Sequence, residues 1–416
     1  MGNYLIIRNF GPVKEAKIEL KPYLILIGGQ GTGKSTIAKL LSIFQEKLWY
    51  LSVLSKEKDK KEDAYLDSFK KCGIHHYFSE DTYLEYQKDE LHLVFDKQFT
   101  LSYQGKTDPE ELQPLLFSLL TENLKKFVGV VKSDLQELTH TLQKSDKQEE
   151  VQLKDYLKDY LTQQYRASII QSTFSNTGDQ LYIPAERNLA ASFSGNLASV
   201  MVSGIPLQDK LLNFISYFEK ARAEHPVYDV PFLHLTYVYS KEEEGIRIPG
   251  MEKPLPLTEC SSGIQALLPM LMVLDYCIDN GIFKGYVIEE PEQNLFPDNQ
   301  LAALRYIVDK NNRHQSSCVI TTHSPYLLSG INLSLMAGRI AQNETFQEKV
   351  NRILPPEYHL ASGSVAAYSL GDADNYCKDI INPQTGTIDQ NYLDTTSSII
   401  GQEFGKLYKL YIQTPK

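Results

Sequence analysis

A glycine-rich segment near the amino end of the chain has the composition of a phosphate-binding loop. Gly28–Ser35 matches the pattern G-x-x-x-x-G-K-[ST] without a gap, directly after the apolar run Leu24–Ile27. Glycines let successive backbone N–H groups turn inward around phosphate oxygens, and the amino end of the following helix adds a favourable dipole. Lys34 would reach the β- and γ-phosphates, and Ser35 would offer its hydroxyl to Mg²⁺. The pattern predicts a nucleoside triphosphate bound by Gly28, Gly29, Gln30, Gly31, Thr32, Gly33, Lys34, Ser35 and Thr36.

Two glutamates follow an apolar run in the second half of the chain. Gly285–Ile288 has the pattern of a buried strand, and Glu289 and Glu290 come directly after it. Because buried parallel strands end at the ligand-bearing edge of an open α/β sheet, these carboxylates should face the nucleotide. Glu289 is suited to hold Mg²⁺, directly or through water, and Glu290 can orient or deprotonate the attacking water. We therefore predict Ser35 and Glu289 as metal ligands and Glu290 as the catalytic base.

A histidine follows a further apolar run. His323 comes after Cys318–Thr322, which has the pattern of another buried strand ending at the same edge of the sheet. A lone histidine is more often structural, but an imidazole at this place can contact the γ-phosphate and respond to its loss. The order of the motifs favours the second interpretation, so we predict His323 as a catalytic residue.

Composition and charge exclude several classes of function. The chain has 416 residues, of which 42% are hydrophobic and 23% charged, as in ordinary globular proteins. Its formal net charge of −10 argues against a globally basic surface that coats nucleic acid, although not against a local basic groove. The longest apolar run, Ala266–Leu274, contains Pro269 and is far shorter than the roughly 20 residues that cross a bilayer. We therefore expect neither a membrane-spanning helix nor a membrane partner.

The amino end and the cysteines favour a cytoplasmic location. Met1–Arg8 lacks the cationic region, apolar region and small-residue cleavage site of a secretory signal. The 5 cysteines are scattered without any paired short spacing, which is typical of reduced thiols in a reducing compartment.

The elements that must position these residues can be outlined from periodicity and turn residues. Strands are expected at 4–8, 16–20 and 24–27, followed by the glycine-rich loop and a helix. The last third of the chain alternates helix and strand, at 263–278, 285–289, 298–309 and 317–322. This alternation predicts a parallel sheet wrapped by helices, and therefore the α/β class.

A helical insertion is expected between the two halves of this core. Apolar residues recur at helical spacing over 120–142 and again over 151–165, with a polar break between, which predicts an antiparallel helical hairpin. The hairpin would either pack on the core or project as an arm. We expect a discontinuous core of residues 1–48 and 172–345, a mostly helical insertion at 49–171 with its hairpin at about 107–170, and a helical or loop extension at 346–416.

Taken together, the order of the motifs resembles ATP-binding-cassette (ABC) ATPases of the soluble branch that includes SMC-like, RecF-like and OLD-like proteins. Leu5–Pro12 resembles the first strand of that branch and its following loop, Glu290–Pro297 its Walker B exit and D-loop, and Thr321–Pro325 its switch-histidine segment. Glu259–Gln265, ahead of a long helix, resembles the signature motif. The resemblance implies a P-loop NTPase fold with a mixed sheet and helices. It also implies a dimer that encloses ATP, in which Ser261, Ser262 and Gly263 bind the γ-phosphate held by a second subunit.

The chain departs from that pattern at several positions. Glu289 stands where most of the family has Asp, Asn294 and Phe296 replace histidines of the D-loop, and Cys260 replaces a leucine. Gln171 and Gln180 both remain candidates for the glutamine that completes the metal site. Arg187 lies in a segment similar to one in OLD-like ATPases, and it would reach phosphate or the partner subunit.

The resemblance also implies a function. No convincing Toprim nuclease segment follows His323. We therefore expect a slow ATPase with ATP and Mg²⁺ as cofactors. Its ATP-bound dimer or higher oligomer would gate a separate effector such as a nuclease or toxin, in bacterial anti-phage defence or a toxin-like system. The alternatives are a DNA repair or recombination ATPase that clamps DNA itself, and an ATP-dependent scaffold that does not hydrolyse.

Overall fold

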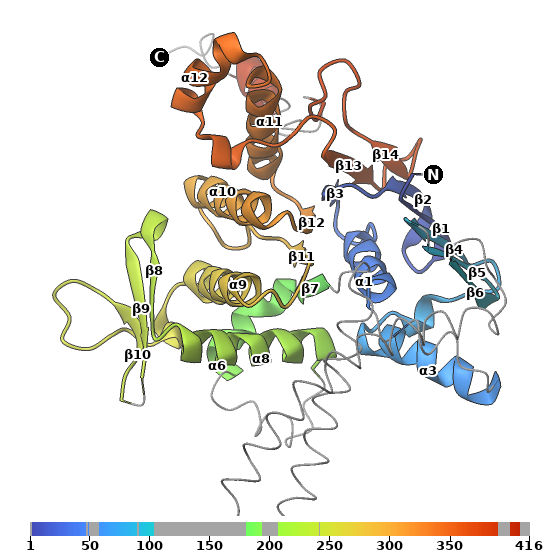
Figure 1. Ribbon diagram of the computed structural model, residues 1–416, viewed down its shortest axis with the longest axis horizontal. Helices are drawn as coiled ribbons and strands as arrows, with labels where there is room; N and C mark the ends of the chain where they lie inside the picture. Colours follow the sequence, from blue (N-terminus) through green and yellow to red (C-terminus); the bar gives the residue numbers. More distant parts are fainter. Residues whose placement is uncertain are drawn as a thin grey trace, which may run out of the picture.

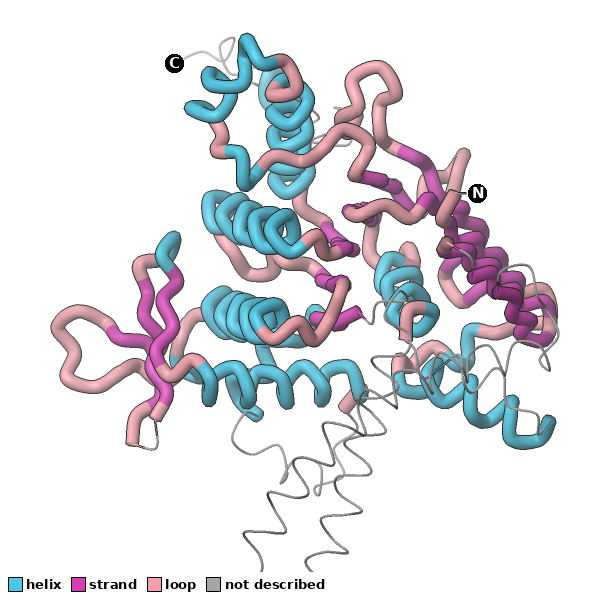
Figure 2. Tube along the Cα trace, viewed as in Figure 1, coloured by secondary structure: helices cyan, strands magenta, loops and turns pink. Residues whose placement is uncertain are grey.

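The computed structural model describes residues 2–46, 49, 58–89, 91–103, 180–193, 207–240, 242–389 and 400–407 (Figures 1 and 2). The predicted helical hairpin at 107–170 lies outside these residues. Within them, the predicted fold class is confirmed: helices and sheets combine in an α/β fold around a loop that joins a buried strand to a helix, as in P-loop NTPases.

A six-stranded sheet forms the centre of the molecule. Its strand order is β14-β13-β3-β12-β11-β7, and every pair is parallel except the edge pair of β13 and β14. The strands β3 and β11 read as continuous apolar runs, because helices cover both faces of the sheet. The bounds are β3 Tyr23–Gly28, β7 Gln180–Ile183, β11 Gly285–Glu289, β12 Ser317–Thr322, β13 Val365–Leu370 and β14 Cys377–Asp379.

Alternate side chains of the central strands pack into two separate hydrophobic cores. Leu24 and Val287 pack with the helix α1, whereas Ile25 and Ile288 pack with the helices of the opposite face, because successive side chains of a strand point to opposite sides. In Figure 1, α1 lies between the central sheet and a second sheet, α3 lies on the same side as α1, and α9, α10 and α11 are stacked across the central sheet from them. The helices are α1 Lys34–Phe44, α3 Lys58–Lys71, α6 Ala190–Phe193, α8 Asp209–Glu224, α9 Ser262–Asp279, α10 Pro297–His314, α11 Pro325–Ile340 and α12 Glu344–Ile353.

The helix α9 is the most apolar of the helices that the structure describes. Among the described residues, it is the one helix long and apolar enough to cross a bilayer, but 72% of its apolar window is buried inside the protein. That degree of burial is typical of a core helix, and α9 packs against α8 and against the short helix after β7.

The second sheet contains strands that the sequence analysis did not predict, within the insertion from residue 49 that was expected to be mostly helical. It is antiparallel, with the order β2-β1-β4-β5-β6, and the strands β4, β5 and β6 come from residues 83–103 (magenta strands beside the N label in Figure 2). The free edge of β1 is thereby paired, and the alternating residues of β4 and β5 bury one face against α1 and α3. The bounds are β1 Tyr4–Phe10, β2 Val13–Glu19, β4 Tyr83–Lys88, β5 Leu91–Asp96 and β6 Gln98–Tyr103.

The segment after residue 345 is also more than the predicted helical or loop extension. It contains β13, which pairs in parallel with β3 from Val365 beside Tyr23 to Leu370 beside Gly28. All six residues of β13 are buried, so this strand belongs to the core sheet. Its two alanines gave it little hydrophobic signal in the sequence.

A third, three-stranded sheet projects from the helical side, at the left of Figure 1. Its order is β10-β9-β8, with bounds β8 Val227–Val230, β9 Leu235–Tyr239 and β10 Glu244–Arg247. Short 3₁₀ helices complete the described elements: η1 His75–Tyr77, η2 Ala185–Leu189, η3 Pro231–Leu233, η4 Leu257–Glu259 and η5 Pro356–Tyr358.

The aromatic core of the second sheet gives a test of this arrangement. The Phe69 side chain of α3 is fully buried, and its ring lies 5.0 Å from that of Phe78 and 6.0 Å from that of Phe99. We expect Phe69→Ala to lower the free energy of unfolding by about 3–5 kcal/mol in urea titration. Phe404→Ala is the control, because that side chain is 66% exposed, and it should change stability by less than about 0.5 kcal/mol. Equal effects of the two substitutions would show that α3 does not belong to the core.

Candidate nucleotide-binding and hydrolysis site

The loop Gly28–Ser35, here called the P-loop, has a backbone that only glycine adopts readily. Gly28, Gly31 and Gly33 have φ angles of 152°, 75° and 82°. A Cβ atom on Gly28 would lie 2.4 Å from the carbonyl oxygen of Leu370, and one on Gly33 would lie 2.5 Å from the Val13 side chain. No side chain caps the amino end of α1, so its first N–H groups remain available to an anion.

The lysine of the P-loop is held inside the loop. Lys34 is only 6% exposed, and its Nζ donates hydrogen bonds of 2.8 Å to the carbonyl oxygens of Gly28 and Gly29. Burial lowers the pKa of Lys34, whereas the nearby Glu290 and Glu292 act in the opposite direction. The ammonium group is thus placed where phosphate oxygens cradled by the loop would lie within its reach.

The predicted metal ligands fit a magnesium ion. Glu289 is the last residue of β11 and is 4% exposed; its Oε2 accepts a 3.4 Å bond from the Ala185 N–H, and its buried Oε1 has no hydrogen-bond partner among the described residues. An orphaned carboxylate oxygen is a suitable ligand for a hard cation, and Ser35 presents an exposed hydroxyl at the start of α1. In the described residues, no three His, Cys, Asp or Glu side chains surround a common metal position.

The predicted catalytic residues lie together. The Oε1 atom of Glu290 is 3.6 Å from Nε2 of His323, and each side chain is about one third exposed. Glu290 follows β11 and His323 follows the neighbouring β12, so the parallel register of the two strands brings them to the same edge. A carboxylate and an imidazole that are both partly exposed to solvent can act on a water molecule and on a phosphate oxygen.

A third glutamate, which the sequence analysis did not single out, fixes the position of His323. Glu292 is 8% exposed, and its Oε1 accepts hydrogen bonds of 2.6 Å from the Thr322 hydroxyl and 2.8 Å from the His323 N–H. Its only signal was its place two residues after Glu290. Ser324 then caps α11 by accepting from the N–H groups of Tyr326 and Leu327.

The C-terminal segment also contacts the P-loop, which the sequence analysis missed. The Tyr376 hydroxyl donates 3.0 Å to the carbonyl of Thr32 and also bonds to the carbonyl of Pro12. A Cβ atom on Gly371 would lie 2.4 Å from the Thr32 side chain. The end of β13 and the residues after it therefore pack directly against the P-loop.

The predicted signature residues lie at the amino end of α9, apart from the P-loop of the same chain. Ser261 and Ser262 are exposed, and a Cβ on Gly263 would lie 2.6 Å from the carbonyl of Asn294. Beside them is a cleft of about 360 Å³, at whose rim Phe296 is 72% exposed. Asn294 follows β11, and β12 separates β11 from β3, which leads to the P-loop, so these two strands are about 10 Å apart.

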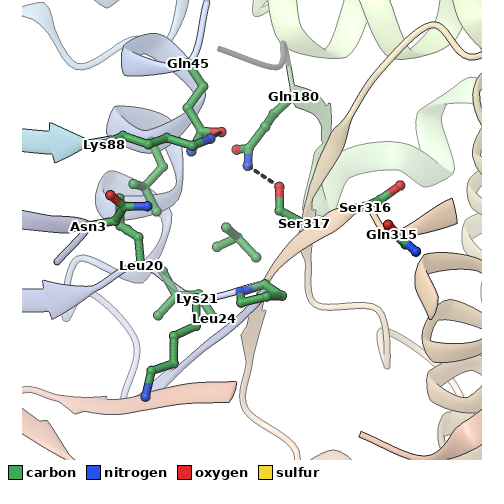
Figure 3. Close-up of a pocket in the computed structure, with 13 residues that line it drawn as sticks. Asn3, Leu20, Lys21, Leu24, Gln45, Lys88, Gln180, Gln315, Ser316 and Ser317 are labelled. Atoms are coloured by element: carbon green, nitrogen blue, oxygen red, sulfur yellow. Dashed lines mark hydrogen bonds between the residues drawn. The ribbon is translucent and has the colours of Figure 1, made fainter. Parts of the chain in front are cut away.

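The structure overturns the expectation for Gln180. Gln180 begins β7 at the amino edge of the sheet, opposite the P-loop. Its Nε2 donates 3.3 Å to the Ser317 hydroxyl, beside a cavity of about 240 Å³ that Lys88 and Gln45 also line (Figure 3). Gln180 therefore does not complete the metal site, and Gln171 lies outside the described residues.

The expectation for Arg187 is also wrong. Its side chain is 0% exposed and bonds to backbone carbonyls of its own chain. It therefore reaches neither phosphate nor the surface that a second subunit would contact.

Comparison with known proteins gives one family assignment. A family model described as an AAA ATPase domain matches residues 1–328. No curated protein matches the chain.

Three solved structures show a remote likeness to the chain. An SMC head bound to the C-winged helix domain of ScpA is 11% identical, with a TM-score of 0.34, over 91% of this chain and 96% of that one. An SMC head domain from Thermotoga maritima is 12% identical, with a TM-score of 0.32, over 79% and 92%. An Smc head domain with an extended coiled coil, bound to the C-terminal domain of ScpA derived from Pyrococcus furiosus, is 11% identical, with a TM-score of 0.31, over 91% and 95%. TM-scores this low carry no argument about function.

The position of Lys34 leads to a binding prediction. We expect Lys34→Ala to weaken ATP binding by about 100-fold or more, because it removes the buried cation that faces the phosphates. Titration with a fluorescent ATP analogue measures this. Lys39→Ala, on the same helix but bonded to Gln208, should keep wild-type affinity. If the two substitutions had equal effects, the P-loop would not be the nucleotide site.

Proposed function

The chain belongs to the family of AAA ATPase domains, and from this premise we propose that it hydrolyses ATP at the carboxyl edge of the central sheet. The observation that carries this proposal is the 3.6 Å pairing of Glu290 with His323 at the edge where the P-loop holds Lys34. A site that only stored nucleotide would have no need of a partly exposed carboxylate and imidazole beside the phosphates.

Different residues of the site bind the phosphates, hold the metal ion and activate the attacking water. The N–H groups of the P-loop and the Lys34 ammonium bind the phosphates, and Ser35 and Glu289 would hold Mg²⁺, which neutralises charge on the phosphate oxygens when bound. Glu290 orients the attacking water and accepts its proton. His323 donates a hydrogen bond to the γ-phosphate, from a position that Glu292 fixes.

We further propose that ATP is enclosed between two copies of the chain. Ser261, Ser262 and Gly263 lie at the uncapped amino end of α9, and the two serines are exposed. The N–H groups at such a helix end favour an anion, and the γ-phosphate held by a second copy is the anion that would complete the site. The dimer would then exist only while ATP is bound.

The nucleotide state would control a separate effector protein, in keeping with a role in bacterial anti-phage defence. Support for a protein partner comes from α11, which begins two residues after His323 and exposes an apolar stripe on one face. The stripe consists of Tyr326, Leu333, Met336 and Ile340, which are 52%, 41%, 42% and 39% exposed. An apolar stripe fits a protein surface rather than the charged backbone of DNA. A cytoplasmic location remains a prediction.

Substitution of the proposed base tests the chemistry. We expect Glu290→Gln to lower the ATPase turnover by about 100-fold or more while ATP binding is kept, because the amide cannot accept the proton of the attacking water. Release of phosphate and binding of a fluorescent ATP analogue are the two measurements. Glu344→Gln, an exposed position on α12, is the matched control and should leave both unchanged. Unchanged turnover in Glu290→Gln would reassign the base, and absence of hydrolysis in the wild type would leave a nucleotide-binding scaffold.

The proposed dimer and partner can be tested with the same trapped protein. With MgATP, Glu290→Gln should elute as a dimer in size-exclusion chromatography with light scattering. Adding Ser262→Arg should return it to a monomer that still binds ATP, since only the partner's γ-phosphate site is blocked. The trapped dimer should retain an effector protein from its host that Lys34→Ala and Leu333→Asp variants do not retain. Retention of DNA in place of a protein would favour the DNA-clamp alternative.

A further inference from the structure

A buried arginine joins three segments around the catalytic glutamate. Arg187 lies in η2, directly after β7, and its side chain is 0% exposed. Its Nη1 donates 3.2 Å to the carbonyl of Pro184 and 2.7 Å to that of Glu289, and its Nη2 donates 2.6 Å to that of Glu290. The Nε atom donates 3.2 Å to the carbonyl of Ala266 in α9. Each of these acceptors is a backbone carbonyl, and together they belong to the end of β7, the end of β11 and the helix α9.

The charge of this side chain is retained in spite of its burial. Burial lowers the pKa of Arg187 to about 10, while Glu292, Glu290 and Glu289 act in the opposite direction. The side chain is therefore protonated at neutral pH. Because a buried charge is unfavourable unless it is compensated, an apolar residue of similar size would be the expected occupant if packing alone mattered.

The bond to Glu290 holds a backbone conformation that glutamate rarely adopts. Glu290 has a φ angle of 43°, in the left-handed region. Three hydrogen bonds hold it there: its own N–H donates to the Thr321 carbonyl at 2.9 Å, and its carbonyl accepts from the Gln293 N–H at 3.0 Å and from Arg187 at 2.6 Å. Arg187 supplies the one side-chain donor among them. Since the backbone conformation sets the direction of the side chain, the placement of the Glu290 carboxylate near His323 depends on these bonds.

The bond to Ala266 connects the same guanidinium to the helix that carries the signature residues. Ala266 lies in the second turn of α9, shortly after Ser262 and Gly263. Pro269 has no N–H to donate to the carbonyl four residues earlier, that of Gln265. The hydrogen-bond ladder of α9 is therefore interrupted at the residue before Ala266. A small shift of this end of α9 would therefore move the guanidinium, and with it the backbone of Glu290.

We propose that Arg187 is a positioning residue for hydrolysis, which links the amino end of α9 to the backbone of Glu290. When a second copy's nucleotide engages Ser261–Gly263, Arg187 transmits the resulting position of α9 to the general base. This inference rests on the proposed function and adds to it the means by which hydrolysis is coupled to dimer formation.

Three variants distinguish positioning from a merely structural role. Arg187→Lys keeps the charge but loses the planar fork of donors, and Arg187→Gln keeps donors but loses the charge. Arg222→Lys is the matched control. Arg222 is also buried, at 3% exposed, but it bonds to the Glu244 side chain in the projecting sheet, away from the P-loop. The melting temperature of each protein is measured first, and kinetics are run below the lowest of them.

We expect both Arg187 variants to lower kcat by about 30-fold or more while the Kd for an ATP analogue stays within about threefold of wild type. Arg222→Lys should lower the melting temperature without lowering kcat. In a Glu290→Gln background, Arg187→Lys should lower the residual rate by less than about threefold, because a residue that acts through Glu290 has nothing left to position. A merely structural role would lower the residual rate as much as the wild-type rate.

Several outcomes would overturn the inference. A wild-type kcat in Arg187→Lys would show that the planar fork of donors is not needed. If kcat, ATP affinity and melting temperature all fell together, Arg187 would have a structural role alone. A full additional loss in the Glu290→Gln background would show that Arg187 does not act through the base. Each of these leaves the proposed ATPase intact if the wild type hydrolyses ATP, whereas a wild type without hydrolysis overturns the proposed function together with this inference.

Discussion

The site depends on the compensation of three glutamates that lie within four residues of each other. Glu289 is the last residue of β11, and Glu290 and Glu292 follow it at a partly buried edge of the sheet. Like charges this close together are unfavourable there. Two cations offset them. Lys34 is 6% exposed and Arg187 0% exposed, and both interact electrostatically with all three carboxylates. The segments that carry these cations must therefore pack against the end of β11, which places the P-loop and η2 on either side of it.

The P-loop in turn is shaped by segments that are far apart in the sequence. Gly33 is packed against Val13 of the second sheet, and Gly28 against the carbonyl of Leu370 at the end of β13. The Tyr376 hydroxyl joins Pro12 to Thr32 across the same loop. The loop is thus enclosed by the amino-terminal sheet on one side and the C-terminal strand on the other. A change in the position of the amino-terminal sheet or of β13 would therefore shift the backbone of the P-loop.

The same edge also connects the nucleotide to surfaces that could report its state. His323 is held by Glu292 and is followed at once by α11, whose capping residue Ser324 donates to Gln300 of α10. Gly263 of α9 lies against Asn294, which follows β11. α9, α10 and α11 therefore each begin within a few residues of a side chain to which we assign a role at the nucleotide. In the proposed function, movement at the γ-phosphate would reach these three helices directly, without a separate relay domain.

The sequence by itself determined the elements whose residues are contiguous. The P-loop, β11 with Glu289 and Glu290, and β12 with His323 were each predictable, because one strand and its following residues form a local unit with its own pattern. The parallel alternation of strands and helices then implied that these units end at one edge. Only the tertiary structure decided the rest. β4 pairs with the free edge of β1, and the alanine-rich β13 pairs with the free edge of β3. In both cases the partner strand is distant in the sequence, so the local pattern does not show the pairing. The contacts of Arg187 could not be predicted for the same reason. Three of its four partner carbonyls are 79, 102 and 103 residues away, and a sequence does not show which backbone carbonyl a side chain will bond to.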